Sequence, residues 1–189
     1  MYNFLKGAIW LIGRILFRVR ITGKENIPKE GAFLLCGNHI HAFDGALLIG
    51  FCKRRLRIFA KKEIFKNPLF AWVFRSVGAF PVDREGTDMQ AYRHTVSSLK
   101  DGWPVLIFSQ GTRMQQYENA KSGVAVFALK TTTPIIPVGI SGTYKIGSKM
   151  KISYGAPISM EEYVGQKIKT ELVDEVMEKL AGRMQGLLK

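Results

Sequence analysis

Short apolar runs alternate with longer segments of helical periodicity along most of the chain. Runs bounded by glycine or turn residues are typical of buried strands, and the segments between them are long enough to be crossover helices. The runs predict strands at 17–21, 32–36, 56–60, 79–82, 105–108, 135–140 and 151–154. The other segments predict helices at 45–52, 67–76, 87–100 and 121–130. This alternation predicts an α/β fold: a single domain with a largely parallel central sheet flanked by helices.

The C-terminal segment predicts one long helix that faces the core. Ser159 and Glu162 have the spacing of a capping box, in which each side chain satisfies a backbone N–H at the helix start. Apolar residues then recur at intervals of four, at Ile168, Leu172, Val176 and Leu180. Such spacing places them on one face, which we expect to be buried.

Residues 1–16 predict an amphipathic helix at a membrane interface, and residues 17–189 the remaining domain. The segment is mostly apolar, but Lys6 and Arg14 interrupt it, so it lacks the long apolar run of a spanning helix. Its basic residues share one side, and Trp10 suits the headgroup level of a bilayer. A helix packed on the domain, with a solvated basic edge, is the alternative.

Charge and cysteine content narrow the class of partner and the compartment. The 189 residues include 28 Lys and Arg against 15 Asp and Glu, a formal net charge of +13. Such an excess points to an anionic partner: nucleic acid, a lipid surface or a phosphate-bearing substrate. Two cysteines, Cys36 and Cys52, cannot build a disulfide framework, and we expect buried, reduced thiols in a cytosolic setting.

His39 and Asp44 lie where a predicted strand runs into a predicted helix. On one continuous helix, residues five apart point about 140° apart, so the two meet only if the chain turns between them. The carboxylate would then fix the imidazole tautomer and leave the second nitrogen free to take a proton. With His41 the pair could also hold zinc. We expect no metal, because only three histidines exist and adjacent positions of an extended chain diverge.

Two further polar groups follow predicted strands. One block is Phe80 to Arg84, and the other is Phe108 to Arg113, which contains Gly111 and Thr112. A Gly-Thr turn offers backbone N–H groups and a hydroxyl, and the planar arginine fork matches phosphate oxygens. Together the two arginines could hold one phosphomonoester.

With these residues in view, the chain resembles the glycerophospholipid acyltransferase family, and within it the bacterial 1-acyl-sn-glycerol-3-phosphate acyltransferases. The resemblance covers nearly all of residues 19–157. It rests on four ordered blocks, at 38–44, 80–84, 108–113 and 136–138.

The resemblance implies an activity and its participants. His39, oriented by Asp44, would remove the proton from the free hydroxyl of 1-acyl-glycerol 3-phosphate (lysophosphatidic acid). That oxygen would attack an acyl-CoA or acyl carrier protein thioester directly, giving phosphatidic acid. The implied acceptor-phosphate site is Arg84, Gly111, Thr112 and Arg113, and the implied acyl-donor side includes Ile136, Pro137 and Val138. The resemblance implies no cofactor, no metal and no nucleic-acid partner, with membrane lipids contacted from the cytoplasmic face by a peripheral or monotopic protein.

The sequence departs from the family pattern at three positions. Ser109 stands where proline is usual, Gln110 where glutamate is usual, and His41 where serine is usual. Glutamine keeps an acceptor oxygen and loses the charge. A non-catalytic lipid-binding relative is therefore an alternative, as is an acyltransferase acting on another lysophospholipid or on glycerol 3-phosphate. A nucleic-acid binder fits the charge alone, but no motif for it is evident.

A basic segment at 53–57 is continued by Lys61, Lys62 and Lys66. One interpretation is a solvated face. The other is attraction to anionic headgroups, or to the phosphates of coenzyme A or an acidic acyl carrier protein.

Overall fold

Seven strands form one twisted sheet in the part of the chain that the structure describes. A computed structural model describes the backbone of residues 1–82, 89–111 and 118–189, and the side chains of 1–82, 89–108 and 123–189. The strands are β1 (Arg18–Thr22), β2 (Leu34–His39), β3 (Arg57–Lys61), β4 (Ala79–Val82), β5 (Val105–Gly111), β6 (Ile135–Gly142) and β7 (Lys149–Tyr154). Their spatial order is β1-β7-β6-β2-β5-β3-β4.

The sheet is largely parallel, as predicted. Strands β6, β2, β5, β3 and β4 are parallel neighbours, while β7 pairs antiparallel with β6 and parallel with β1. All predicted strands are confirmed, and β2 and β5 each run three residues past the predicted end. Both extensions are at the carboxyl edge of the parallel strands, where open α/β sheets place their sites.

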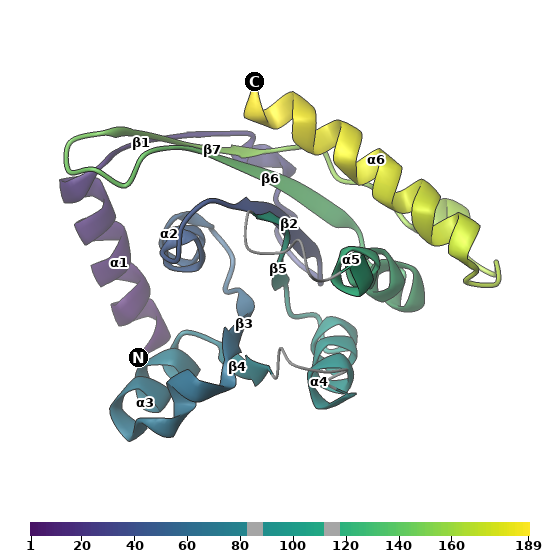
Figure 1. The fold of residues 1–189 in the computed structure, drawn as a ribbon, viewed down its shortest axis with the longest axis horizontal. Helices are drawn as coiled ribbons and strands as arrows, with labels where there is room; N and C mark the ends of the chain where they lie inside the picture. Colours follow the sequence, from purple (N-terminus) through teal and green to yellow (C-terminus); the bar gives the residue numbers. More distant parts are fainter. Residues whose placement is uncertain (83–88, 112–117) are drawn as a thin grey trace.

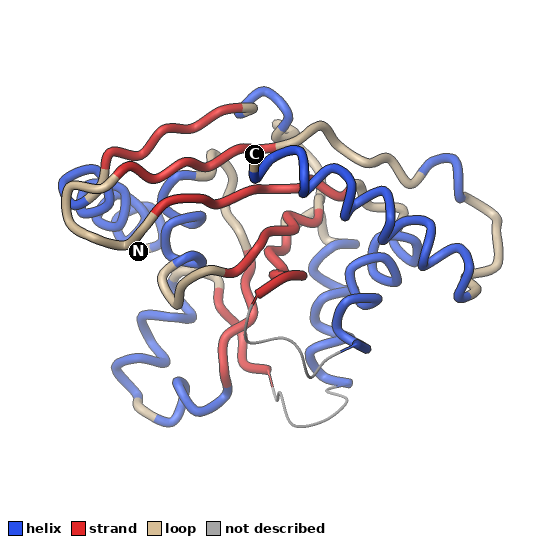
Figure 2. The backbone as a smooth tube through the Cα atoms, turned by 45° about the horizontal axis from the view of Figure 1, so that its top comes forward, coloured by secondary structure: helices blue, strands red, loops and turns tan. Residues whose placement is uncertain are grey.

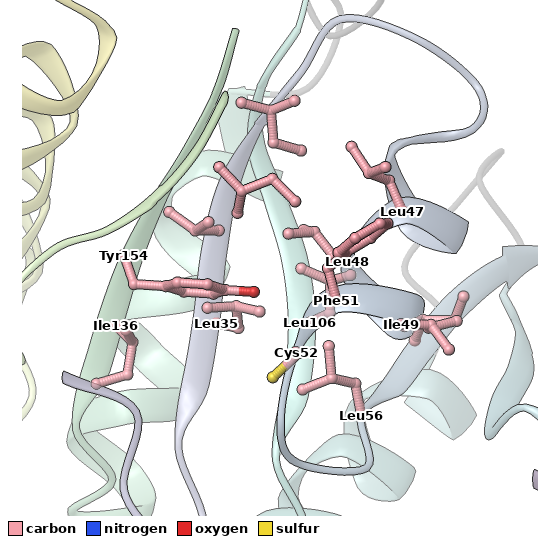
Figure 3. Packing of buried hydrophobic residues seen from close by; sticks show 14 of the residues in the cluster. Leu35, Leu47, Leu48, Ile49, Phe51, Cys52, Leu56, Leu106, Ile136 and Tyr154 are labelled. Carbon is pink, nitrogen blue, oxygen red and sulfur yellow. The ribbon is translucent and has the colours of Figure 1, made fainter. Parts of the chain in front are cut away.

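Helices cover both faces of the sheet (Figures 1 and 2). They are α1 (Tyr2–Leu16), α2 (Asp44–Phe51), α3 (Pro68–Ser76), α4 (Met89–Lys100), α5 (Glu118–Thr131) and α6 (Thr170–Leu188). Successive residues of β2 point to opposite faces, so Leu35 joins the cluster under α1 and α2, and Leu34 joins the cluster under α5 and α6. Figure 3 shows Leu48 and Phe51 of α2 beside Leu35 in the first of these clusters.

The predicted start of the C-terminal helix is wrong. The Ser159 hydroxyl accepts from the Glu161 N–H at 3.2 Å, but only a short 3-10 turn follows, Glu161–Tyr163, and its N-cap residue is Met160. The turn ends at Tyr163, Gly165 then adopts a left-handed conformation with a φ of 82°, and α6 begins only at Thr170. Within α6, Val176 and Leu180 are buried against the sheet and Leu172 is partly buried, as their spacing predicts. Ile168 precedes the helix and is exposed, so the prediction is wrong for this residue.

Helix α1 is docked on the domain and still carries an apolar outer face. Tyr2, Leu5 and Ile9 pack on the core. A Cβ atom at Gly50 of α2 would lie 2.8 Å from the Ile9 Cγ2 atom, so this glycine permits the close approach of the two helices. Helical geometry puts Phe4, Leu11 and Ile15 on the opposite side, where all three are exposed. No helix in the described ranges combines the length and the apolarity needed to cross a bilayer.

Candidate active site

His39 and Asp44 form a hydrogen-bonded pair at the carboxyl edge of the sheet. His39 is the last residue of β2 and Asp44 is the first of α2. The loop between them turns the chain, and the His39 Nδ1 atom lies 2.8 Å from the Asp44 Oδ2 atom. The turn that the spacing requires is therefore present.

The Asp44 carboxylate is fully buried and receives hydrogen bonds on both oxygens. Its Oδ2 atom accepts from the backbone N–H groups of Ile40 and His41, each at 2.7 Å, in addition to His39. Its Oδ1 atom accepts from the Tyr144 hydroxyl at 2.6 Å. Burial alone would raise the pKa of Asp44, but the hydrogen bonds from His39, Tyr144 and the two N–H groups lower it below its usual value. The carboxylate is thus ionised at neutral pH.

The imidazole of His39 is held in place and remains accessible. Its ring stacks on that of Phe108 with centroids 4.5 Å apart and planes 19° apart. The His39 side chain is 24% exposed. Because an ionised carboxylate can only accept, the Nδ1 atom carries the proton, and the Nε2 lone pair is free to accept another. This is the arrangement of a general base.

Asn38 keeps the end of β2 attached to β6. Backbone pairing of the two strands ends at Gly37 and Val138. Beyond it, the Asn38 amide nitrogen donates to the Ile140 carbonyl at 2.8 Å, and the Ile140 N–H donates to the Asn38 side-chain oxygen at 2.7 Å. The buried Asn38 side chain thus replaces one rung of the sheet and fixes the strand end that carries His39.

Replacing Asn38 by leucine should lower the free energy of unfolding by about 2–4 kcal/mol, because the buried N–H and carbonyl of Ile140 would lose their hydrogen-bond partners. Urea denaturation measures the change. Asn26→Leu is the matched control, because Asn26 makes one side-chain bond, to the Tyr154 carbonyl at 3.0 Å, in a less buried place. If both variants lost equally little stability, the Asn38 side chain would not hold the strand.

A register shift brings the end of β5 beside His39. Gly37 pairs with Phe108, but Asn38 pairs with Gln110 and His39 with Gly111, so Ser109 is an extra residue in β5. Bulges of this kind re-aim the chain at the rim of a site. Gly111 therefore lies opposite His39. The other predicted phosphate ligands, Arg84, Thr112 and Arg113, lie outside the described residues.

Two other predicted groups can be placed. Ile136 and Val138 are buried in β6, next to β2, and the predicted role of the Ile136–Pro137–Val138 block toward the acyl donor stays a prediction. The exposed His41 ring stacks on Tyr144 with centroids 4.3 Å apart. Among the described residues, no group of three histidine, cysteine or acidic side chains is arranged to hold a metal ion.

Three arginines of the basic segment have structural partners, and one of them, Arg55, donates to the Asn3 side-chain oxygen at 3.1 Å. Arg54 donates to the carbonyl oxygens of Pro28 and Gly31, both at 2.8 Å. Arg57 donates to the Ser98 hydroxyl at 2.7 Å. The 53–57 segment leads into the amino end of β3. Lys61 is the last residue of β3, and Lys62 and Lys66 follow it, on the edge that carries His39. The solvated-face interpretation is thus incomplete, because Arg54 bonds to loop carbonyls and Arg57 bonds to Ser98 of α4.

Tyr144 was not a candidate from the sequence. It follows β6 in a loop and lies 100 positions from the carboxylate it contacts. A single tyrosine after a strand carries no motif, and only the three-dimensional arrangement shows its hydrogen bond to Asp44.

Comparisons with known proteins identify relatives of this chain. A family model described as Acyltransferase matches residues 18–141. A 1-acyl-sn-glycerol-3-phosphate acyltransferase of Bacillus subtilis (strain 168) is 28% identical over 99% of this chain and 100% of its own length. One from Streptococcus pneumoniae is 29% identical over 97% of this chain and 70% of its own length.

A solved structure shares the fold. The 1-acyl-sn-glycerophosphate (LPA) acyltransferase of Thermotoga maritima superposes with a TM-score of 0.71 at 22% identity, covering 98% of this chain and 79% of the other. The family match spans the strand that ends in His39, the helix that begins with Asp44, and all the predicted phosphate ligands. This chain belongs to the acyltransferase family.

Proposed function

We propose that this protein transfers an acyl chain from an acyl thioester to the free hydroxyl of 1-acyl-glycerol 3-phosphate, giving phosphatidic acid for phospholipid synthesis. The observation that carries the proposal is the His39–Asp44 pair, 2.8 Å apart at the carboxyl edge of the sheet. The names of relatives that match nearly the whole chain support this choice of acceptor.

The geometry supports direct transfer with His39 as general base. The Nε2 atom takes the proton from the acceptor hydroxyl while its oxygen attacks the thioester carbonyl carbon. The new C–O bond forms, the C–S bond breaks, and the imidazolium returns the proton to the departing thiolate. The Asp44 carboxylate stabilises the transient imidazolium and keeps the ring oriented. No acyl-enzyme is needed in this scheme.

The acceptor phosphate would bind beside His39 through Gly111, Thr112, Arg113 and Arg84. Gly111 supports this placement, because it is paired with His39 across β2 and β5. A phosphomonoester there would leave its glycerol hydroxyl near the imidazole. Two guanidinium groups and a backbone N–H are the donors that a dianionic phosphate prefers.

We further propose that α1 lies at the cytoplasmic face of the membrane, as in a peripheral or monotopic protein. Its outer side exposes Phe4 (75%) and Ile15 (71%). Phe17, the residue after α1, contacts the Tyr144 ring edge-on with ring centroids 5.5 Å apart, and the Tyr144 hydroxyl bonds to Asp44. The carboxyl end of the helix therefore adjoins the His39–Asp44 pair, so an amphiphilic acceptor has a short path from lipid to the base.

Helix α3 supports the same orientation. Six consecutive residues, 69–74, are apolar, yet only Ala71 is buried, and Leu69 (64%) and Trp72 (52%) are exposed. Lys66 and Arg75 flank them. A second copy docked on this face by two-fold symmetry would bring like charges together, whereas an anionic bilayer neutralises them. In both views α1 and α3 lie on the left side of the molecule (Figures 1 and 2).

Replacing Leu11 and Ile15 together by serine should weaken binding to anionic vesicles about tenfold or more, because each exposed side chain contributes about 1–2 kcal/mol when it enters lipid. Flotation with phosphatidylglycerol vesicles measures the bound fraction. Val164→Ser removes an equally exposed apolar residue from a loop near α6 and should bind normally. Equal binding of all three proteins would contradict a role for α1.

The function is tested by a grid of substrates. Acyl-CoA and acyl carrier protein thioesters are combined with lysophosphatidic acid, other lysophospholipids and glycerol 3-phosphate, and products are read by mass spectrometry. We expect phosphatidic acid from wild type and not from His39→Ala. Turnover only with another acceptor would replace the proposed substrate. No turnover by wild type in any combination would favour a non-catalytic lipid-binding protein, the alternative raised by Gln110.

A further inference from the structure

We propose that Tyr144 is a positioning residue that acts on His39 through Asp44. Its hydroxyl holds the carboxylate in the rotation that directs the Oδ2 atom toward the imidazole. The inference rests on the proposed function, because a fixed base matters only where His39 takes a proton.

The contact comes from the side of the carboxylate that the local chain does not reach. The Oδ2 atom receives its bonds from His39, Ile40 and His41, all within five residues of Asp44. The Oδ1 atom receives the Tyr144 hydroxyl at 2.6 Å. Asp44 is fully buried, and a buried charged oxygen without a donor is costly. The phenol therefore satisfies Oδ1 and opposes rotation of the carboxylate about the Cβ–Cγ bond.

Tyr144 is itself held firmly enough to do this. Its ring contacts the Phe17 ring edge-on, with centroids 5.5 Å apart, and stacks on the His41 ring, with centroids 4.3 Å apart. Its loop is tied to the end of α1, because the Gly147 N–H donates to the Leu16 carbonyl at 2.7 Å. Burial and the neighbouring carboxylate raise the pKa of Tyr144 far above its usual value. The hydroxyl thus stays protonated and can only donate to Asp44.

The Tyr144 hydroxyl and the His39 ring both donate hydrogen bonds to the negatively charged Asp44 carboxylate, so the hydroxyl weakens the interaction of this charge with His39. Once the hydroxyl is removed, the Asp44 carboxylate interacts more strongly with the imidazolium form of His39 than it does in wild type. The ionisable groups around Asp44 in the described chain are His39, Tyr144 and, stacked on Tyr144, His41. A role confined to packing would change none of this, which separates the two explanations.

Tyr144→Phe keeps the ring and removes the oxygen. We expect kcat to fall about tenfold, the size of one hydrogen bond to a charged group, with KM for the acceptor within about twofold. The acid limb of the kcat/KM profile should move to higher pH than in wild type. Unchanged kcat with a superimposable pH profile would overturn the proposal.

Tyr163→Phe is the matched control. The Tyr163 hydroxyl also donates to a carboxylate, Glu175 Oε1 at 2.8 Å, but in the cluster under α5 and α6. The Tyr163→Phe variant should have the same kcat and the same pH profile as wild type. Thermal unfolding of both variants reports whether each is folded, so a loss of activity is read only from folded protein.

A measurement without substrate separates this inference from the proposed function. Nitrogen NMR of protein with labelled histidines follows the His39 ring through a pH titration, assigned with His39→Ala. Its midpoint should rise in Tyr144→Phe relative to wild type and Tyr163→Phe. The same midpoint in all three proteins would overturn the inference, whereas absent turnover with a shifted midpoint would count only against the proposed acyl transfer.

Discussion

Replacing His39 by alanine should lower kcat about 10²–10⁴-fold, the usual contribution of a positioned general base. The expectation follows from the free Nε2 atom of a ring whose Nδ1–H is held by Asp44 at 2.8 Å. Without the imidazole, the acceptor hydroxyl must lose its proton to water. The phosphate ligands are untouched, so KM for lysophosphatidic acid should change little.

Initial rates on mixed micelles, with thiol release from the donor as the readout, measure the effect. His94→Gln is the control, because His94 is an exposed histidine of α4 outside the His39–Asp44 pair. Its ring centroid lies 4.2 Å from that of Phe80. The His94→Gln variant should retain wild-type rates. If His39→Ala turned over as fast as this control, the base would have to be another group and the proposed mechanism would fail.

The sheet could be predicted because its signal is local. Each buried strand is a short apolar run that ends at glycine or a turn, and parallel pairing follows from the length of the crossovers. The ends of the strands could not be predicted this way. Polarity at Asn38 suggests a loop, but its side chain bonds to the backbone of Ile140 and keeps this residue within the sheet. That bond depends on a strand 102 positions away.

The C-terminal helix shows a different limit. Ser159 and Glu162 have the spacing of a cap, but here only a single turn follows, and Gly165 is left-handed between that turn and α6. A capping pattern that favours a helix and a glycine that interrupts one can thus lie within a few residues of each other. Burial of Val176 and Leu180 was predictable, because it depends on the period of the helix and not on its start.

In the candidate site, the residues near in sequence were found and the distant one was not. His39 and Asp44 are separated by one turn of chain, so their chemistry and spacing indicate the pair. Tyr144 reaches the same carboxylate from the loop after β6. Charge alone was also a weak guide. In the basic segment, Arg54 and Arg57 have structural roles. The Arg54 guanidinium donates to two loop carbonyls, and that of Arg57 donates to the Ser98 hydroxyl.

Asp44→Asn should retain the geometry of the pair and lose its charge. Two backbone N–H groups, from Ile40 and His41, point at the Oδ2 position, so the amide oxygen must occupy it and the amide NH₂ must face Tyr144. His39 then still donates to an oxygen and keeps the active tautomer. The imidazolium loses its anionic partner, and we expect kcat/KM to fall about 10²–10³-fold, less than where such a change reverses the tautomer.

The pH profile of kcat/KM shows whether the lost charge causes the loss of activity in Asp44→Asn. Removing the anion destabilises the protonated imidazole, so the acid limb of kcat/KM should move to lower pH, opposite to Tyr144→Phe. Because the folded-state pKa of Asp44 is lowered, its charge stabilises the fold fully above the unfolded value of about 3.9 and loses this effect as the pH falls through the folded value. Urea denaturation should therefore show wild type more stable than Asp44→Asn at pH 7, with the difference shrinking on acidification below about pH 4. A stability difference independent of pH, together with an unmoved acid limb, would mean that the carboxylate acts only by its shape.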